Sequence, residues 1–337
     1  MTGLPPPLVV TMGEPAGIGG EITLMAWLRR EAGLPPFFLI DDADRLERLG
    51  SSLGLPVPVQ RIGTAEEAAS AFAEALPVLH RPLAVPPAAG RLDPANAPRV
   101  IAAIEEAVGL VRAGEASAVV TNPIHKKGLY AAGFSFPGHT EFLAALAGDG
   151  ARAVMMLAIP GLRVVPVTVH MPLRRAIATL DTAAIVATAE AVDASLRRDF
   201  GIARPRLSVA GLNPHAGEEG SLGEEDAAVV APAVAALRAA GVQADGPVPP
   251  DALFTPRARA GYDAAICLYH DQALIPLKAL DVDHGVNITL GLPFVRTSPD
   301  HGTALDIAGT GVASPTSLMA ALTTAAELAR NRAAASP

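Results

Sequence analysis

Residues 266–309, ICLYHDQALIPLKALDVDHGVNITLGLPFVRTSPDHGTALDIAG, hold an unusual density of polar chemistry. The segment begins with an apolar run that predicts a buried strand, and His270 follows directly. An amphipathic run to Lys278 comes next, then extended segments around Asn287 and up to Arg296, and then a turn at 300–303. A possible metal ligand, two cations and a glycine-containing turn therefore fall within 44 residues. We expect the upstream chain to supply the scaffold and the partner ligands for this segment.

Length and composition limit the class of protein. A chain of 337 residues is too long for one small domain, so two lobes are expected. Hydrophobic residues make up 50% of the chain and charged residues 18%, which indicates a globular protein. The net charge of -8 and the lack of a basic stripe argue against nucleic acid as a partner.

Targeting signals are not recognisable in the sequence. The N-terminal segment lacks the charged and long apolar regions of a signal peptide. No run reaches 18 uninterrupted apolar residues, so no membrane span is expected. The single cysteine, Cys267, lies in an apolar run and fits a reducing compartment, so we expect a cytoplasmic protein.

Strand and helix patterns alternate along the chain, which predicts an α/β protein with a largely parallel sheet. The predicted strands are 8–12, 37–40, 57–62, 118–121, 153–158, 162–169 and 207–212. The predicted helices include 21–31, 65–75, 97–113, 172–179, 182–198, 224–240 and 315–330. The Pro/Ala-rich segment 81–98 and the Pro/Gly-rich segment 241–250 are predicted to be irregular.

Between the first strand and the first helix lies a glycine-rich turn, residues 13–20. A strand, a glycine turn and a helix in this order can offer backbone N–H groups to an anion. The spacing matches neither GxxxxGK[ST] nor GxGxxG, so a tight structural turn is an equally good interpretation.

Three histidines stand at corresponding places, since His170, His215 and His270 each follow the C-terminal end of an apolar strand. In open α/β sheets, ligands bind beyond the C-terminal ends of the strands. Three imidazoles that converge there would bind zinc or a similar divalent ion and leave a coordination position for substrate. The alternative is that each histidine caps its own strand through a backbone hydrogen bond. The equivalence of the three positions favours the metal site, whose ligands could also meet across a subunit boundary.

Five further residues are suited to an anion. His139 and Thr140 are predicted at a helix start, where the N–H groups and the dipole favour negative charge, although Thr140 could equally be the N-cap. Lys278, Asn287 and Arg296 form a donor set suited to phosphate or carboxylate, unless the two cations are solvated surface charges.

Taken together, these residues resemble the 4-hydroxythreonine-4-phosphate dehydrogenase family of vitamin B6 biosynthesis. The matching motifs span nearly the whole chain and are GEPAGIG (13–19), GHTEF (138–142), VHMPL (169–173), LNPHAGE (212–218), YHDQ (269–272) and GVNITLGLPFVRTSPDHGTALDIAG (285–309). One departure is Gly20, where the family usually has a proline. Residues 301–309 and 313–321 are also similar to the cofactor loop and following helix of isocitrate and isopropylmalate dehydrogenases.

The resemblance implies an α/β fold of two α/β/α lobes with an active-site cleft between them, similar to isocitrate and isopropylmalate dehydrogenases and not a Rossmann fold. It implies a cofactor-side lobe of residues 1–122 plus 290–337. A second lobe, residues 123–289, would carry the metal site, the substrate site and the dimer contact. The expected assembly is a homodimer whose subunits share metal ligands.

The resemblance also assigns roles to residues. The implied metal ligands are His170, His215 and His270, with one divalent ion per site, zinc in preference to magnesium, manganese or cobalt. The implied contacts to the phosphorylated substrate are His139, Thr140, Lys278, Asn287 and Arg296. The residues implied to approach the adenosine part of NAD or NADP are His301, Gly302 and Thr303. Lys278 is also a candidate proton carrier, provided that burial near the cation depresses its pKa.

The implied reaction is NAD(P)-dependent oxidation of 4-phosphohydroxy-L-threonine to a 3-keto acid, which decarboxylates to 3-amino-2-oxopropyl phosphate. One alternative is a sister dehydrogenase of a four-carbon sugar acid phosphate, such as threonate or erythronate 4-phosphate. A three-histidine metal hydrolase is a second alternative, and the loop at 300–309 argues against it. A phosphate-binding module without catalysis is a third, and the strand-end histidines argue against that.

Overall fold

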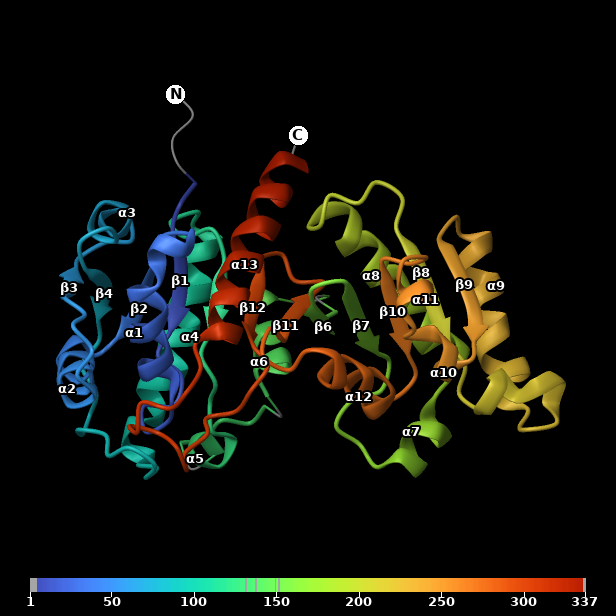
Figure 1. The fold of residues 1–337 in the computed structure, drawn as a ribbon, viewed down its shortest axis with the longest axis horizontal. Helices are drawn as coiled ribbons and strands as arrows, with labels where there is room; N and C mark the ends of the chain where they lie inside the picture. Colours follow the sequence, from blue (N-terminus) through green and yellow to red (C-terminus); the bar gives the residue numbers. More distant parts are fainter. Residues whose placement is uncertain (1–4, 131, 137, 149, 151, 336–337) are drawn as a thin grey trace. The chain divides into compact units, whose positions relative to one another are not determined.

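The computed structural model describes residues 5–130, 132–136, 138–148, 150 and 152–335. The chain divides into two compact units, the first Met1–Ala151 with Leu292–Arg330 and the second Arg152–Gly291 with Asn331–Pro337. Strands and helices alternate in both units (Figure 1), so the predicted α/β class is confirmed. None of the described helices is long and apolar enough to cross a membrane.

The first unit is built on a parallel sheet. Its strands, in spatial order, are β3 (Val59–Ile62), β4 (Leu76–His80), β2 (Phe37–Asp41), β1 (Leu8–Thr11), β5 (Val119–Thr121) and β12 (Arg296–Pro299). Its helices are α1 (Gly19–Leu28), α2 (Ala43–Leu53), α3 (Glu67–Ala71), α4 (Ala97–Arg112), α5 (Lys126–Tyr130), α6 (His139–Ala147) and most of α13 (Thr316–Ala335). Strands β1 and β2 are buried along their whole length, as expected of parallel strands covered on both faces.

The second unit has a mixed sheet. Its strands, in spatial order, are β11 (Val286–Leu290), β6 (Val154–Ile159), β7 (Leu162–Pro166), β10 (Ala264–Cys267), β8 (Arg206–Ala210) and β9 (Gln243–Val248). Strand β6 is antiparallel to both β7 and β11, whereas β7, β10, β8 and β9 are parallel to one another. Its helices are α7 (Leu173–Thr179), α8 (Thr182–Arg198), α9 (Ala231–Ala239), α10 (Pro250–Leu253), α11 (Pro256–Arg259) and α12 (His270–Leu280).

Two strands were not predicted from the sequence. The structure replaces the predicted helix 65–75 by the short helix α3, and the buried strand β4 follows it, paired with both β2 and β3. The segment 241–250 was predicted to be irregular, but it contains β9, which lies at the edge of the sheet and pairs with β8. An edge position tolerates the glycine and proline that led to the wrong prediction.

Several element boundaries also differ from the prediction, and two of these differences involve a proline or a predicted site residue. The predicted helix 224–240 is a π-helical turn, Asp226–Val230, followed by α9, because Pro232 lacks the N–H group that a regular helix needs. Arg296 was predicted to end an extended segment, but it begins strand β12 and is buried there.

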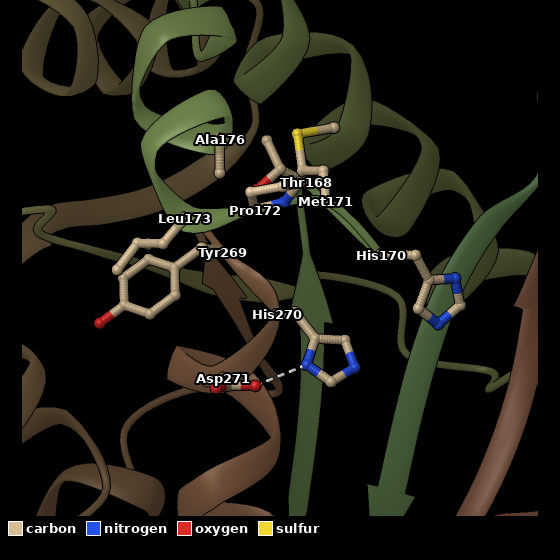
Figure 2. Close-up of a pocket in the computed structure, with 9 residues that line it drawn as sticks. All are labelled: Thr168, His170, Met171, Pro172, Leu173, Ala176, Tyr269, His270 and Asp271. Atoms are coloured by element: carbon tan, nitrogen blue, oxygen red, sulfur yellow. Dashed lines mark hydrogen bonds and ion pairs between the residues drawn. The ribbon is translucent and has the colours of Figure 1, made fainter.

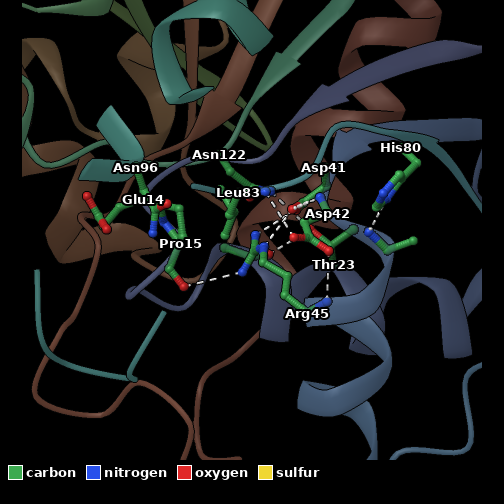
Figure 3. Close-up of polar contacts among 12 residues, drawn as sticks. Glu14, Pro15, Thr23, Asp41, Asp42, Arg45, His80, Leu83, Asn96 and Asn122 are labelled. Atoms are coloured by element: carbon green, nitrogen blue, oxygen red, sulfur yellow. Dashed lines mark hydrogen bonds and ion pairs between the residues drawn. The ribbon is translucent and has the colours of Figure 1, made fainter. Parts of the chain in front are cut away.

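A buried ion pair holds the glycine turn of the first unit (Figure 3). The Arg45 guanidinium donates to both carboxylate oxygens of Asp41, with Nε–Oδ1 at 2.5 Å and Nη2–Oδ2 at 2.6 Å, and the two side chains are 3% and 0% exposed. Arg45 Nη1 also donates to the carbonyl of Pro15 at 3.3 Å. A β-carbon on Gly20 would lie 3.2 Å from that same nitrogen. Gly20, which stands where the family usually has a proline, therefore leaves space for the Arg45 side chain.

We predict that Arg45→Met lowers the free energy of unfolding by about 3–5 kcal/mol, because it leaves the Asp41 carboxylate buried without its partner. Urea denaturation followed by circular dichroism measures the loss. The matched control is Arg61→Met, which breaks the half-exposed Arg61–Asp44 pair and should cost about 1 kcal/mol or less. Equal losses in the two variants would contradict a special role for the buried pair.

Candidate functional site

The three histidines follow three neighbouring strands of the second unit. Strand β10 lies between β7 and β8 and is parallel to both, so their C-terminal ends share one edge. His170 comes four residues after β7, His215 five residues after β8, and His270 begins α12 three residues after β10. The sequence pattern of three equivalent strand ends is thus a pattern of adjacent strand ends.

Two of these histidines lie together. The rings of His170 and His270 have centroids 5.7 Å apart, and both line a pocket of about 330 Å³ (Figure 2). His270 Nδ1 lies 2.7 Å from Asp271 Oδ1. An ionised carboxylate only accepts hydrogen bonds, so in a neutral imidazole this bond would come from Nδ1 and leave Nε2 as the nitrogen for a ligand. The pocket is lined by Thr168, His170, Met171, Pro172, Leu173, Ala176, Tyr269, His270 and Asp271.

Backbone strain marks two of the three positions. His170 and His215 have φ of 47° and 51°, a left-handed conformation that is rare for residues with a side chain. After His215 the left-handed backbone continues through Glu219. The carboxylate of Asp226 holds the start of this loop by accepting from Leu212 N at 2.7 Å and Asn213 N at 3.0 Å. Such strain clusters at functional sites, where the surrounding structure stabilises it.

The described residues of the chain bring together two of the three predicted metal ligands. His170 and His270 offer imidazole nitrogens, a ligand type that zinc prefers, and Asp271 lies beside one of them, so the chemistry of this pair suits a divalent ion. His215 does not join them, because no group of three or more His, Cys, Asp or Glu side chains in the described part of the chain is arranged to hold a metal ion.

A buried cationic corner forms in the first unit around Arg296. Its guanidinium is buried and donates through Nη2 to Thr121 Oγ1 at 2.6 Å, and burial lowers the pKa of Arg296 to about 9. Burial, with the nearby charges of Arg296 and Lys126, holds the pKa of His139 well below its usual range. His139 Nε2 is enclosed and has no hydrogen-bond partner in the described part of the structure. An anion in this corner would favour the charged form of Arg296 and accept hydrogen bonds there.

Helix α6 adds N–H groups to this corner. The helix begins at His139, and its N-cap is Gly138, which makes no side-chain cap. The alternative that Thr140 is the N-cap is therefore wrong, and Thr140 lies in the first turn. The first N–H groups of a helix have no partners within the helix and attract anions.

The two remaining predicted substrate contacts lie in the second unit. Lys278 is exposed near the end of α12, and Asn287 is half-buried in β11. The suggested role of Lys278 as a proton carrier depends on its burial, but the side chain is exposed in the single chain.

The loop that carries His301, Gly302 and Thr303 packs against the glycine turn. Ile18 N donates to the Thr303 carbonyl at 3.0 Å, and a β-carbon on Gly17 would lie 2.8 Å from that oxygen. The turn thus has a structural role as a support for this loop. Glu21, whose side chain is fully buried in α1, accepts from Gly309 N at 2.8 Å. Sequence reasoning missed Glu21, although a carboxylate within the apolar segment GGEITLMAWL is a recognisable signal.

These features define an α/β protein with imidazoles at strand ends and a cationic corner suited to an anionic small molecule. The sequence model described as "Pyridoxal phosphate biosynthetic protein PdxA" matches residues 34–325, and the chain belongs to this family. The resemblance noted in the sequence is thereby confirmed.

Individual relatives agree with the family match. A 4-hydroxythreonine-4-phosphate dehydrogenase of Methylorubrum populi is 56% identical over 331 residues, covering 96% of this chain and 95% of the relative. One of Bradyrhizobium diazoefficiens is 53% identical over 338 residues, covering 96% and 97%. The crystal structure of 4-hydroxythreonine-4-phosphate dehydrogenase from Klebsiella pneumoniae is 38% identical, with a TM-score of 0.86 over 96% of this chain and 99% of that one.

We predict that the stability of the protein falls below about pH 6.5 through His139, whose pKa is lowered in the folded state. Below that pH the unfolded chain takes up a proton that the folded chain does not, so stability decreases as pH falls, by at most about 1.4 kcal/mol per pH unit for one proton. Unfolding free energies of the wild type and His139→Gln between pH 7.5 and 5.5 measure this slope. A wild-type curve parallel to that of His139→Gln would refute the prediction.

Proposed function

We propose that the protein oxidises 4-phosphohydroxy-L-threonine with NAD⁺ or NADP⁺ in the biosynthesis of pyridoxal 5'-phosphate. The C3–H bond is lost as hydride to the nicotinamide and the hydroxyl proton is released. The resulting 3-keto acid loses its C1 carboxylate as CO₂ and takes up a proton at C2, giving 3-amino-2-oxopropyl phosphate. The observation that carries this proposal is the similarity to two proteins named 4-hydroxythreonine-4-phosphate dehydrogenase. They are 53% and 56% identical to this chain over nearly the whole length of both chains.

His170, His215 and His270 would hold one divalent ion per site, zinc in preference to magnesium, manganese or cobalt. A divalent ion supplies a Lewis acid, which lowers the pKa of a hydroxyl bound to it and stabilises negative charge that develops nearby. Support comes from the neighbouring rings of His170 and His270 and from the Asp271 carboxylate that orients His270. Because His215 does not join this pair within the described part of the chain, it would complete the set from the partner subunit.

The substrate phosphate would lie in the cationic corner of the first unit, against His139, Thr140 and Arg296. With its pKa lowered, His139 is neutral near pH 7 and acts as a hydrogen-bonding group, while Arg296 supplies the charge. The N–H groups at the start of α6 add to this site. Lys278 and Asn287 are proposed as further contacts. Lys278 would also carry a proton if the partner subunit buries it.

The loop of His301, Gly302 and Thr303 is proposed to contact the adenosine part of the nicotinamide cofactor, which itself supplies the hydride-acceptor chemistry. Support comes from the way the chain holds this loop. Ile18 N bonds to Thr303, and the buried Glu21 bonds to Gly309 at the far end. A loop held at both ends loses less entropy when a ligand binds to it.

We also propose that the protein acts as a homodimer in the cytoplasm. Exposed apolar side chains gather on α7 and on α12 with the residues that follow it, and helices α7 and α12 border the histidine pocket. They are Leu173, Ile177, Ile275, Leu280 and Val282. Apolar groups of this kind mark protein–protein contacts, and a contact here would bring a second chain close to the histidines. The single cysteine, buried in β10, suits a reducing compartment.

The proposal is tested by the absorbance of reduced nicotinamide. We expect turnover of 4-phosphohydroxy-L-threonine with NAD⁺ or NADP⁺, loss of turnover with a chelator, and recovery when Zn²⁺ is restored. His215→Ala should abolish turnover without unfolding the protein, since His215 is exposed and makes up one third of the proposed ligand set.

Three outcomes would contradict parts of this proposal. Turnover of threonate 4-phosphate alone would move the protein to a sister dehydrogenase with the same mechanism. Full activity of His215→Ala would remove the three-histidine site. Absence of turnover with either substrate, in a protein that retains metal, would favour a hydrolase.

The dimer contact is tested by Ile275→Asp, which places a charge at a side chain that is 66% exposed on α12. We expect the wild type to sediment at twice the mass of the chain, and the variant to dissociate at least tenfold more readily, by about 1.4 kcal/mol or more, because a buried unpaired carboxylate is costly. Val312→Asp is the control, because Val312 is 69% exposed in the other unit and should leave the dimer intact. An unchanged dimer in Ile275→Asp would place the contact elsewhere.

A further inference from the structure

The side chain of Gln272 joins two of the three histidine-bearing strand ends. Gln272 is the third residue of α12 and is 5% exposed. Its Oε1 accepts from Leu268 N at 2.7 Å, two residues before His270. Its Nε2 donates to the Gly211 carbonyl at 2.7 Å, four residues before His215. One amide therefore spans from the end of β10 to the end of β8.

Thr168 extends this connection to the third strand end. Its buried hydroxyl donates to the Leu268 carbonyl at 2.8 Å, and Thr168 lies two residues before His170. Both polar backbone groups of Leu268 are therefore hydrogen-bonded to side chains. Its carbonyl accepts from Thr168, which follows β7, and its N–H donates to Gln272, which in turn bonds to Gly211 after β8. We call Thr168, Leu268, Gln272 and Gly211 the strand-end tie.

The strand-end tie lies just beyond the last residues that pair through backbone hydrogen bonds. Strands β7, β10 and β8 end at Pro166, Cys267 and Ala210, so each histidine lies beyond the paired residues. The bond from Val167 N to the Cys267 carbonyl, 2.7 Å, is a backbone bond just beyond the end of β7. Past this point, side chains replace the backbone in holding the strand ends to one another.

A glutamine suits this position for a chemical reason. The bond to Leu268 N resembles an N-terminal helix cap, which a glutamate would also make. The bond to the Gly211 carbonyl needs a donor, and it crosses to another strand, so capping does not explain it. A side-chain amide offers an acceptor and a donor on one planar group.

We propose that Gln272 and Thr168 are positioning residues that fix the three strand ends to one another and thereby set the relative positions of His170, His215 and His270, the proposed ligands of a metal ion. This inference rests on the proposed metal site. The two side chains act through the backbone that carries the histidines and do not touch the ion. Groups that orient metal ligands typically change metal affinity about 10–100-fold when they are removed.

The experiment uses Gln272→Met and Thr168→Val, which keep side-chain volume and remove the hydrogen bonds. Tyr262→Phe is the matched control. This change removes one hydrogen bond, from the Tyr262 hydroxyl to the Leu253 carbonyl at 3.0 Å. Tyr262 lies two residues before the start of β10, at the opposite end of that strand from His270. Metal-free samples are titrated with Co²⁺. Its visible absorption reports both occupancy and coordination geometry, and thermal unfolding of the same metal-free samples reports stability.

We expect Gln272→Met to weaken Co²⁺ binding at least about tenfold and to change the intensity of the visible bands. Thr168→Val should do the same in a smaller measure, while Tyr262→Phe keeps the wild-type affinity and spectrum. A helix cap alone would lower the unfolding temperature of Gln272→Met without altering the Co²⁺ spectrum. If Gln272→Met does not fold, Thr168→Val carries the test.

The outcomes separate this inference from the proposed function. Wild-type affinity and spectrum in a folded Gln272→Met or Thr168→Val overturn the positioning role and leave the metal site in place. A wild-type protein that binds no Co²⁺ removes the metal site, and the positioning role falls with it. Equal weakening by Tyr262→Phe overturns the inference as well, because the effect would then follow from general destabilisation.

Discussion

The parallel pairing of β10 with β7 on one side and β8 on the other is the constraint on which the candidate site depends. Parallel strands end at the same edge, so three segments far apart in the chain deliver their next residues to one edge of the sheet, where His170 and His270 lie together. The alternating sheet order also gives His270 the central strand, with His170 and His215 on the flanking ones. The buried residues of these strands supply the packing that keeps the edge rigid, which a site made of exposed histidines cannot supply for itself.

Much of this arrangement could be predicted from local patterns. Short apolar runs followed by His170, His215 and His270 gave both the strands and the side chains at their ends, because burial and strand period are visible within a few residues. Strand β9 could not be predicted in this way, since its glycine and proline are turn residues and only the pairing with β8 makes it a strand. The same holds for β4, whose two partners lie in other parts of the sequence.

Polar contacts between distant residues were beyond sequence reasoning. Gln272 bonds to a residue 61 positions away and Thr168 to one 100 positions away, and no spacing within either motif indicates the partner. The left-handed backbone at His170 and His215 was equally hidden, because most histidines have negative φ and the residue type does not indicate this conformation as a glycine does. The motifs did give the residue types, and these were sufficient to suggest the chemistry of the imidazoles and of Arg296.

The contact between Gly20 and Arg45 has a consequence for the history of this chain. The nitrogen that bonds to the Pro15 carbonyl would lie 3.2 Å from a β-carbon at position 20, which is a tight contact. A residue with a side chain at position 20 would therefore require the Arg45 side chain to shift slightly. The residue at position 20 therefore limits the side chain at position 45, and we expect the identities of these two residues to covary among homologues.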